Sequence, residues 1–341
     1  MKRTQIIIVV AIVVAVVAAL VGVSAATYRH QALAINQPVR VEIPRGSTYD
    51  ALLDSLEAHN CLNNRALFSA AGHARGLATN VRSGSYLMQP HMSLATVIQK
   101  LYTGNQDPIK LTIGKYRTTR QLADHLGAKL DLEADTIYAL LTDSATLANY
   151  GCTPQTVFLL FPQNTYEVYW DIKPNKLLDR MKRESNHFWN PTRLDRCQSL
   201  GLTPEQVLTL ASIIDEETNV AAEKDTMASV YLNRLRRGIP LQADPTVRYA
   251  LGDFTIRRIL TSHTQIVSPY NTYLNRGLPP GPICTPLPKT IDAVLANLQT
   301  NYLYFCAKED FSGRHNFAAT LKQHQANANR YHQALNARNI K

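Results

Sequence analysis

Residues 203–218 read TPEQVLTLASIIDEET and carry the start and face signals of a helix. Thr203 is a natural N-cap, Pro204 suits the first helical position, and Gln206 completes a capping box. Apolar residues then recur at positions 207, 210, 211 and 214, as they do on one face of a helix. We therefore expect a helix here, and the chain up to residue 237 forms either two successive helices or one helix with a break near residues 218–222.

The three acidic residues at the end of this stretch differ in their position around the helix. At about 100° per residue, Glu216 lies opposite the apolar stripe and is expected to be solvated, whereas Glu217 lies at its margin. Burial raises the pKa of a carboxyl, and a raised pKa lets a glutamic acid donate a proton near neutral pH. Glu217 is therefore the candidate acid, although the periodicity alone favours an ordinary acidic helix surface.

Two further carboxylates follow. Glu223 shares a face of the next helix with Val230, so it is expected to point inward. A buried carboxylate needs a partner, which Arg234 or a backbone amide can supply, and this favours a structural or supporting role for Glu223. Asp244 precedes a proline, which favours an extended or turn backbone, so its side chain either caps a turn or points into a cleft.

A stiff, aromatic segment lies further along the chain. Residues 268–273 read SPYNTY, and residues 277–282 read GLPPGP. Tyrosine faces and asparagine amides suit sugar rings and N-acetyl groups, which makes Asn271 and Tyr273 candidates for sugar binding. Proline-rich loops are, however, more often plain scaffolding.

The N-terminal segment predicts the cellular location. Residues 6–26 contain no charge and no proline, and a helix of this length spans roughly 31 Å, enough to cross a hydrocarbon core. The alternative is a cleaved signal peptide, whose apolar part is usually shorter, about 7–15 residues. A retained anchor is favoured, with Lys2 and Arg3 holding the N-terminus in the cytoplasm, although Arg29 beyond the segment weakens the charge asymmetry.

The composition is that of a folded protein with a basic excess. Hydrophobic residues make up 45% of the 341 positions, so the chain can bury the cores of two or three domains. The net charge of +10 suits an anionic partner such as nucleic acid, phospholipid head groups or acidic cell-wall polymer. Because no nucleic-acid motif accompanies the charge, nucleic acid is not expected as a partner. The five cysteines lack CxxC spacing, which favours small buried hydrophobic residues over metal or redox chemistry.

Helix and strand patterns alternate along the remaining chain, which indicates an α+β fold. Strands are expected at residues 39–43, 85–88, 109–113 and 302–307. Helices are expected after Ser47, over residues 65–74, between Ser93 and Gly104, around Leu122, through much of residues 130–200 and over residues 318–336. Residues 158–170 form an aromatic interruption, and residues 239–290 have the composition of long ordered loops.

An ordered series of motifs resembles the YceG-like family, the endolytic murein transglycosylases. The series covers roughly residues 35–340; each motif alone is weak, but their order and spacing are specific. The motifs are ASIIDEET at 211–218, VYLNRL at 230–235, LQADPTV at 241–247, PYNTY at 269–273, GLPPGPI at 277–283, YLYF at 302–305 and HNF at 315–317.

The resemblance implies an α+β, membrane-bound enzyme of four parts. They are a cytoplasmic tail at residues 1–5, a transmembrane helix at residues 6–26, a small LysM-like glycan-binding module at residues 35–115 and a mixed α/β catalytic domain at residues 116–341, with the active-site helix around residues 203–218. We expect a single-pass protein of the cell (inner) membrane whose catalytic domain faces the extracytoplasmic or periplasmic side. Its expected partners are peptidoglycan glycan strands, the membrane and peptidoglycan synthases.

The resemblance also identifies Glu217, the second glutamate of the family's E-x-E-T element, as the catalytic residue. Asp215 replaces the first glutamate of that element, which indicates that this position is not the proton donor. Further candidates are Gln242, Asn271 and Tyr273 for holding N-acetyl groups, Asp244 for organising its loop or steadying oxocarbenium charge, and Glu223 for support. No metal and no cofactor is expected.

The implied reaction is cleavage of the bond between MurNAc and GlcNAc in nascent glycan strands. It gives 1,6-anhydroMurNAc ends and terminates strand elongation. One carboxyl suffices, since Glu217 can protonate the leaving oxygen and then take the proton of the MurNAc C6 hydroxyl. The enzyme alternative is a hydrolytic muramidase that uses Glu217 and Asp244. A non-catalytic cell-wall scaffold that recruits a synthase is the alternative from another class.

Overall fold

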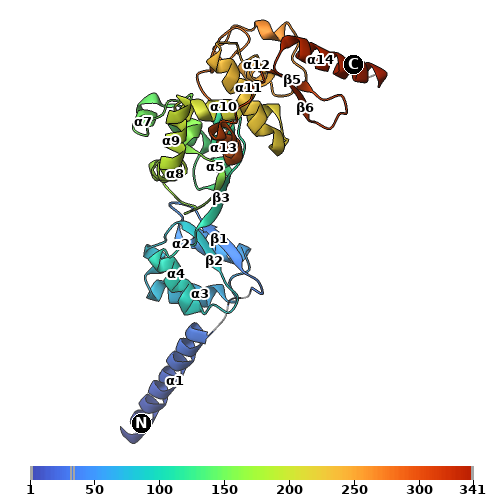
Figure 1. Cartoon of the computed structure of the whole chain (residues 1–341). Helices are drawn as coiled ribbons and strands as arrows, with labels where there is room; N and C mark the ends of the chain where they lie inside the picture. The colour runs from blue at the N-terminus through green and yellow to red at the C-terminus, as the bar shows by residue number, and fades with distance from the viewer. Residues whose placement is uncertain (1–2, 31–32, 34, 339–341) are drawn as a thin grey trace. The chain divides into compact units, whose positions relative to one another are not determined.

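The structure is a computed structural model that describes residues 3–30, 33 and 35–338. It is a mixed α+β protein, as the sequence predicted (Figure 1). By its internal contacts the chain divides into two compact units. Unit 1 comprises residues 1–111, 129–131 and 167–172, and unit 2 comprises residues 112–128, 132–166 and 173–341.

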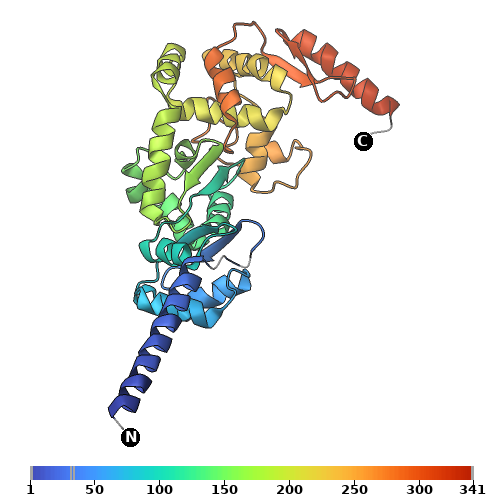
Figure 2. The same cartoon turned by 90° about the horizontal axis from the view of Figure 1, so that it is seen from below.

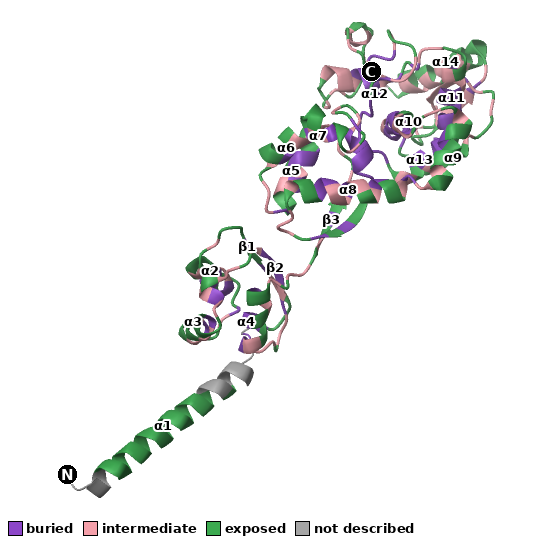
Figure 3. Cartoon of the chain, turned by 90° about the vertical axis from the view of Figure 1, so that its left-hand side faces the viewer, coloured by how far each residue is buried: buried purple, intermediate pink, exposed green. Residues whose placement is uncertain are grey.

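Helix α1 (Arg3–His30) begins the described chain. Its stretch Ile6–Val23 has a mean hydropathy of 3.5, and its side chains are exposed, as the green colour in Figure 3 shows. The helix is long and apolar enough to cross a membrane, in agreement with the predicted apolar helix at residues 6–26. Met1 and Lys2 of the predicted cytoplasmic tail lie outside the described residues.

Unit 1 contains a two-stranded antiparallel sheet and helices that share one apolar core. Strand β1 (Val39–Ile43) pairs with β2 (Gly84–Met88), and Val41 lies opposite Tyr86. The helices are α2 (Tyr49–Ala58), α3 (Arg65–Ala74) and the short η1 (Leu77–Thr79) between the strands, and α4 (Leu94–Thr103) after them. Ser93 caps α4 and Gly104 ends it with a φ of 70°, which confirms both predicted ends.

A second strand pair joins β3 (Ile109–Ile113) to β4 (Asn164–Val168). The sequence predicted β3, but β4 lies in the segment that was predicted only as an aromatic interruption. The division between the two units runs through both strands.

Residues 119–200 are mainly helical, which confirms the prediction for this region. The elements are α5 (Thr119–Lys129), α6 (Ala134–Thr142), α7 (Ser144–Ala148), η2 (Val157–Leu160), α8 (Pro174–Phe188) and α9 (Pro191–Leu200).

Helix α10 (Pro204–Glu217) lies at the centre of unit 2. Thr203 and Gln206 form the predicted capping box at its start. The helix packs against α9, α11 (Lys224–Arg236), α12 (Asp244–Leu251) and α13 (Pro288–Ala296). All residues from 207 to 215 are buried, and Figure 3 colours this helix largely purple. The helix is therefore enclosed on all sides and does not have the single apolar stripe that the sequence suggested.

The chain after α10 bends as the sequence predicted. The short η3 (Ala221–Glu223) separates α10 from α11, which confirms the break near residues 218–222. Residues 239–290 contain η4 (His263–Gln265) and long loops, but also α12, which was not predicted. Asp244 is the first residue of α12, and the proline that follows it lies in the first turn, so the expectation of an extended or turn backbone at Asp244 is wrong. The extended residue is Ala243, one position earlier.

The C-terminal part of unit 2 is a hairpin covered by a helix. Strands β5 (Tyr304–Ala307) and β6 (His315–Ala318) pair antiparallel, with Phe305 opposite Phe317. Helix α14 (Leu321–Ala337) packs against both strands, and both views show it beside the hairpin (Figures 1 and 2). The sequence predicted β5 and α14, whereas β6 was not predicted.

Candidate functional site

A pocket of about 370 Å³ in unit 2 contains most of the predicted site residues. It gathers side chains from the end of α10, from α11, from the chain before and within α12, from the loop after η4 and from β5 and α14. The lining residues are Glu217, Arg234, Leu241, Gln242, Asp244, Tyr273, Tyr304, Phe305, Leu321 and His324. Glu217, Gln242, Asp244 and Tyr273 were predicted from the sequence.

Glu217 is the last residue of α10, and its carboxyl lines the pocket. The Tyr231 hydroxyl on α11 donates a hydrogen bond of 2.8 Å to Glu217 Oε1. Burial raises the pKa of Glu217 to about 7, and the negative charge of Asp244 acts in the same direction, while the Tyr231 hydrogen bond and Arg248 oppose it. The carbonyl end of α10 also disfavours a negative charge at this position. Glu217 therefore exists as acid and as carboxylate near neutral pH.

Asp215 and Glu216 have structural partners. Asp215 is buried, pairs with Lys224 and accepts a hydrogen bond of 2.6 Å from the Leu287 amide, which ties α10 to α11 and to the start of α13. The Glu216 side chain is only 6% exposed and lies 2.7 Å from Lys115 and 2.9 Å from Arg117. The expectation that Glu216 is solvated is therefore wrong, because α10 is enclosed on all sides. Of the three acidic residues, Glu217 is the one that lines the pocket.

A second carboxylate lies in the same pocket. The Tyr273 hydroxyl donates a hydrogen bond of 2.6 Å to Asp244 Oδ1. Burial, followed by the hydrogen bond to Asp244 and then by the charge of Asp244, raises the pKa of Tyr273, so its hydroxyl stays protonated and remains a donor. This bond orients the Asp244 carboxylate at the start of α12.

Gln242 lines the pocket in an uncommon backbone conformation, with a φ of 52°. Its Oε1 accepts a hydrogen bond of 2.6 Å from Arg234 Nη2. Arg234 also donates to the backbone oxygens of Pro240 and Leu303, at 2.7 and 3.0 Å. The guanidinium thus fixes the Gln242 side chain and joins two loops that border the pocket.

Asn271 and Glu223 do not line the pocket. Asn271 is fully buried, and its Nδ2 donates to the backbone oxygens of Thr264 and Ile266 at 2.9 and 2.8 Å. Its Oδ1 accepts a hydrogen bond of 3.0 Å from the Tyr273 amide. Its amide is therefore engaged within the loop and supports Tyr273 rather than facing a ligand.

Glu223 points inward, as predicted. Its Oε1 accepts a hydrogen bond of 3.0 Å from the His315 amide, and its Oε2 lies 3.0 Å from His315 Nδ1. A backbone amide was one of the two expected partners; the other, Arg234, binds elsewhere. Glu223 thus joins the start of α11 to β6.

Tyr304, Phe305, Leu321 and His324 complete the pocket from the C-terminal hairpin and helix. The sequence did not single them out as site residues. The motif at residues 302–305 entered only through the resemblance, and nothing local distinguishes His324 from the other polar residues of α14. The packing of β5 on α11 brings Tyr304 and Phe305 to the pocket, and the packing of α14 on β5 and β6 brings Leu321 and His324.

Within residues 3–30, 33 and 35–338, no group of three or more His, Cys, Asp or Glu side chains is arranged to hold a metal ion. All five cysteines are free thiols, and four of them are buried. The pocket itself offers a carboxyl with a raised pKa, that of Glu217, and such a group suits proton transfer.

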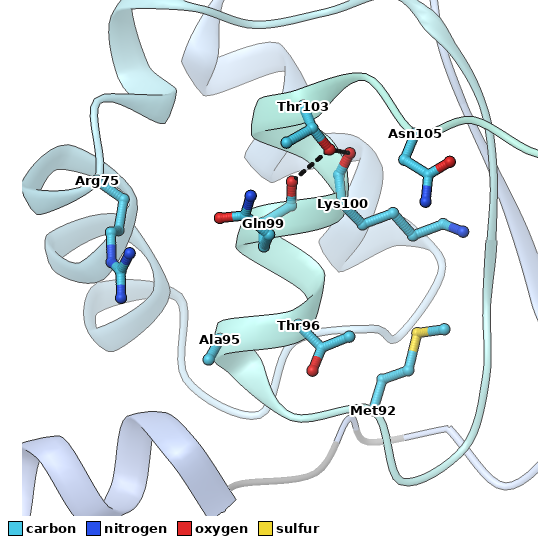
Figure 4. Close-up of a pocket in the computed structure, with 8 residues that line it drawn as sticks. All are labelled: Arg75, Met92, Ala95, Thr96, Gln99, Lys100, Thr103 and Asn105. Carbon is cyan, nitrogen blue, oxygen red and sulfur yellow. Dashed lines mark hydrogen bonds between the residues drawn. The ribbon is translucent and has the colours of Figure 1, made fainter.

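A second pocket, of about 530 Å³, lies along α4 in unit 1 (Figure 4). Hydroxyl and amide side chains border it, together with two basic residues and two apolar ones. The lining residues are Arg75, Met92, Ala95, Thr96, Gln99, Lys100, Thr103 and Asn105. Lys100 lies 2.8 Å from Asp107. The hydroxyl, amide and basic groups of this lining suit hydrogen bonding to a polar ligand.

Comparisons with known proteins place these features in a family. The YceG-like family model matches residues 41–330, which include every residue of the Glu217 pocket. The endolytic murein transglycosylase of Bacillus subtilis is 29% identical over 309 residues, covering 86% of this chain and 84% of the relative. The protein of that name from Streptococcus pneumoniae serotype 2 is 28% identical over 320 residues, 85% of this chain but 57% of the longer relative.

A solved structure agrees with the fold. The crystal structure of a YceG-like protein from Listeria monocytogenes is 29% identical and matches with a TM-score of 0.56. The match covers 85% of this chain and 99% of that protein. With most of its length matched by the family model, this chain belongs to the YceG-like family.

Proposed function

We propose that this chain is a membrane-anchored lytic transglycosylase that cleaves peptidoglycan glycan strands. The proposal is supported by membership of the YceG-like family and by relatives named endolytic murein transglycosylases. The observation that carries it is the Glu217 carboxyl, which faces a pocket, is held by the Tyr231 hydroxyl and has a pKa raised to about 7. Such a group can both donate and accept a proton at neutral pH.

In the proposed reaction Glu217 performs both proton transfers. The acid protonates the oxygen between MurNAc and GlcNAc as the bond from that oxygen to MurNAc C1 breaks. The carboxylate then takes the proton of the MurNAc C6 hydroxyl while the oxygen of that hydroxyl bonds to C1. This closes a 1,6-anhydro ring and returns Glu217 to the acid form without consuming water. On nascent strands, such a cut would terminate elongation.

The remaining pocket residues suit supporting roles. Asp244, oriented by the Tyr273 hydroxyl, supplies a negative charge that can steady the positive charge developing at C1. Gln242, fixed by Arg234, offers an amide for an N-acetyl group. The rival enzyme reading uses Asp244 to activate water, as in a muramidase with two carboxylates.

The decisive experiment is a mass spectrum of the products from purified glycan strands treated with the full chain in detergent. Anhydro ends support the transglycosylase, whereas reducing ends, heavier by one water, support the muramidase. The Glu217→Gln protein is the matched control for contaminating activity. If that inactive variant still complements a deletion of the gene, the non-catalytic scaffold is favoured instead.

We further propose that residues 35–115 form a LysM-like glycan-binding module. The support is the order strand, two helices, strand in unit 1, together with the hydroxyl- and amide-bordered pocket on α4; the link to glycan is by analogy. Replacing Gln99 and Asn105, both exposed, by alanine should weaken binding of long strands by the full chain. The exposed Gln333 in α14, replaced by alanine, is the control.

For location, we propose a single-pass protein of the cell (inner) membrane with a cytoplasmic N-terminus and an extracytoplasmic catalytic part. The apolar helix α1 supports it. Peptidoglycan synthases are the proposed protein partners, since an enzyme acting on nascent strands works where those strands are made.

A further inference from the structure

The C-terminal helix α14 contributes a histidine to the Glu217 pocket. His324 lines this pocket, and its ring stacks on Tyr304 of β5 with ring centroids 5.3 Å apart and planes 19° apart. Helix α14 packs on the β5–β6 hairpin, so the position of His324 is set by packing and not by a free terminus (Figures 1 and 2).

Packing does not explain why this residue is a histidine. His324 Nδ1 is buried and has no hydrogen-bonding partner among the residues that the structure describes. An unpaired buried nitrogen lowers stability, and a phenylalanine could stack on Tyr304 without that disadvantage. The histidine is therefore expected to have a role other than stabilising the fold. Since Nδ1 is covered, Nε2 is the nitrogen that can meet a ligand.

The surroundings of His324 keep its ring neutral. Burial, followed by the positive charge of Arg234, lowers the pKa of His324. The other titratable groups of the pocket are Glu217, Asp244 and Tyr273, with Tyr304 directly against the ring. A neutral imidazole has one donor and one acceptor nitrogen, which suits an uncharged polar ligand better than an anion.

We propose that His324 is a substrate-contacting residue whose Nε2 forms a hydrogen bond with a sugar hydroxyl or N-acetyl group of the strand bound across Glu217. The inference deepens the proposed function and rests on it for the identity of the ligand. It makes α14 part of the sugar-binding site. Uncharged hydroxyl and amide groups are the ones that a neutral imidazole matches in a pocket that already holds two carboxyls.

Two substitutions separate hydrogen bonding from packing. His324→Phe keeps a ring against Tyr304 but loses the nitrogen, whereas His324→Gln loses the ring but keeps a donor and an acceptor. The control is His332→Phe, an exposed histidine on the same helix. KM and kcat for strand cleavage are measured with the full chain in detergent, and the Kd for intact strands is measured in the Glu217→Gln background. Thermal unfolding tests that each variant is folded.

We expect His324→Phe to raise KM and Kd about tenfold, the size of one lost hydrogen bond, with kcat changed less than about threefold. His324→Gln should keep more affinity than His324→Phe, and His332→Phe should match the wild type. A His324→Phe protein with wild-type KM and Kd would overturn the proposal. If His324→Phe unfolds, His324→Leu takes its place under the same criteria.

The same assays distinguish a wrong assignment of His324 from a wrong assignment of the proposed function. A wild-type protein that releases no anhydro ends contradicts the transglycosylase assignment, whatever His324 does. In that case the Kd measurement still decides whether His324 contacts the strand. An active wild type with an unaffected His324→Phe variant contradicts only the role of His324.

Discussion

The Tyr231 hydroxyl donates a hydrogen bond to Glu217 Oε1 across 2.8 Å, and so joins the middle of α11 to the last residue of α10. Tyr231 is almost fully buried, and its ring meets Phe305 edge to face at 5.8 Å, which fixes the direction of the hydroxyl. The bond stabilises the carboxylate form of Glu217, while burial and Asp244 stabilise the acid form. The pKa of about 7 is the balance of these effects.

Removal of this hydroxyl should shift the pH dependence of cleavage. In Tyr231→Phe the carboxylate loses a donor, so the pKa of Glu217 should rise further and the fall in activity at high pH should move upward by roughly one unit. The measurement is the pH profile of kcat/KM on glycan strands. Tyr302→Phe, a half-buried tyrosine that does not line the pocket, is the control. An unshifted profile in Tyr231→Phe would show that this bond does not tune the acid.

The raised pKa of Glu217 also predicts a pH-dependent gain in stability for Glu217→Gln. The folded protein holds this proton up to about pH 7, whereas a glutamate in the unfolded chain loses it near its ordinary pKa of 4.5. The stability that the protonated group contributes is therefore present at low pH and lost as the pH rises through about 7. Glutamine cannot ionise, so its Tm should exceed that of the wild type by several degrees at pH 8 and by little at pH 4. Equal differences at both pH values would contradict the raised pKa.

Local signals predicted the ends of α10 and missed its surroundings. Thr203 and Gln206 form their capping box within one turn, so the sequence alone determines that start. The prediction that Glu216 is solvated failed because it assumed that α10 buries only one face, whereas α10 is enclosed by four other helices. Strand β6 is four residues long and pairs with β5 only in the folded chain. Four residues are too few for an alternating pattern that would predict a strand.

The candidate site likewise combines residues that local sequence identified with contacts that only the folded chain reveals. Glu217 was found because a motif carries it, and Asp244 and Tyr273 because they belong to distinctive stretches of sequence. Their mutual hydrogen bond could not be read from residues 29 positions apart. His324 was missed because its place in the pocket depends on the docking of α14 against β5.

Glu223 should contribute to stability and not to chemistry. Replacing it with alanine leaves the His315 amide and ring without their carboxylate, which should destabilise the protein by about 1–3 kcal/mol. Thermal unfolding measures this, and Asp225→Ala, an exposed acid in the first turn of α11, is the control. A Tm unchanged from the wild type would mean that the link between α11 and β6 is dispensable.

The apolar helix α1 should keep the chain in the membrane. A reporter fused after Lys341 is expected to be active only outside the cytoplasm, and the full-length protein should remain in the membrane fraction after carbonate washing. The reason is the uncharged stretch Ile6–Val23, which is long enough to span a bilayer. Release of a shortened soluble form would instead support a cleaved signal peptide.

The two glutamates at the end of α10 provide the sharpest test of the catalytic assignment. Glu217→Gln keeps the size of the side chain but cannot donate or retrieve a proton. Loss of general acid–base catalysis typically reduces the rate about 10²–10⁴-fold, and a sole catalytic group should lie at the upper end. We therefore expect a loss of at least ~10³-fold in the release of anhydro ends, with folding and strand binding retained.

Glu216→Gln should have the opposite pattern, because Glu216 pairs with Lys115 and Arg117 away from the pocket. Its replacement leaves two basic groups without their shared carboxylate, so the Tm should fall, by an amount corresponding to about 1–3 kcal/mol. The rate per folded molecule should change less than about tenfold, because Glu217, the proposed proton donor, is intact. Both variants are assayed on the same strands at a temperature where each is folded. An inactive Glu216→Gln protein together with an active Glu217→Gln protein would show that Glu217 is not the catalytic acid.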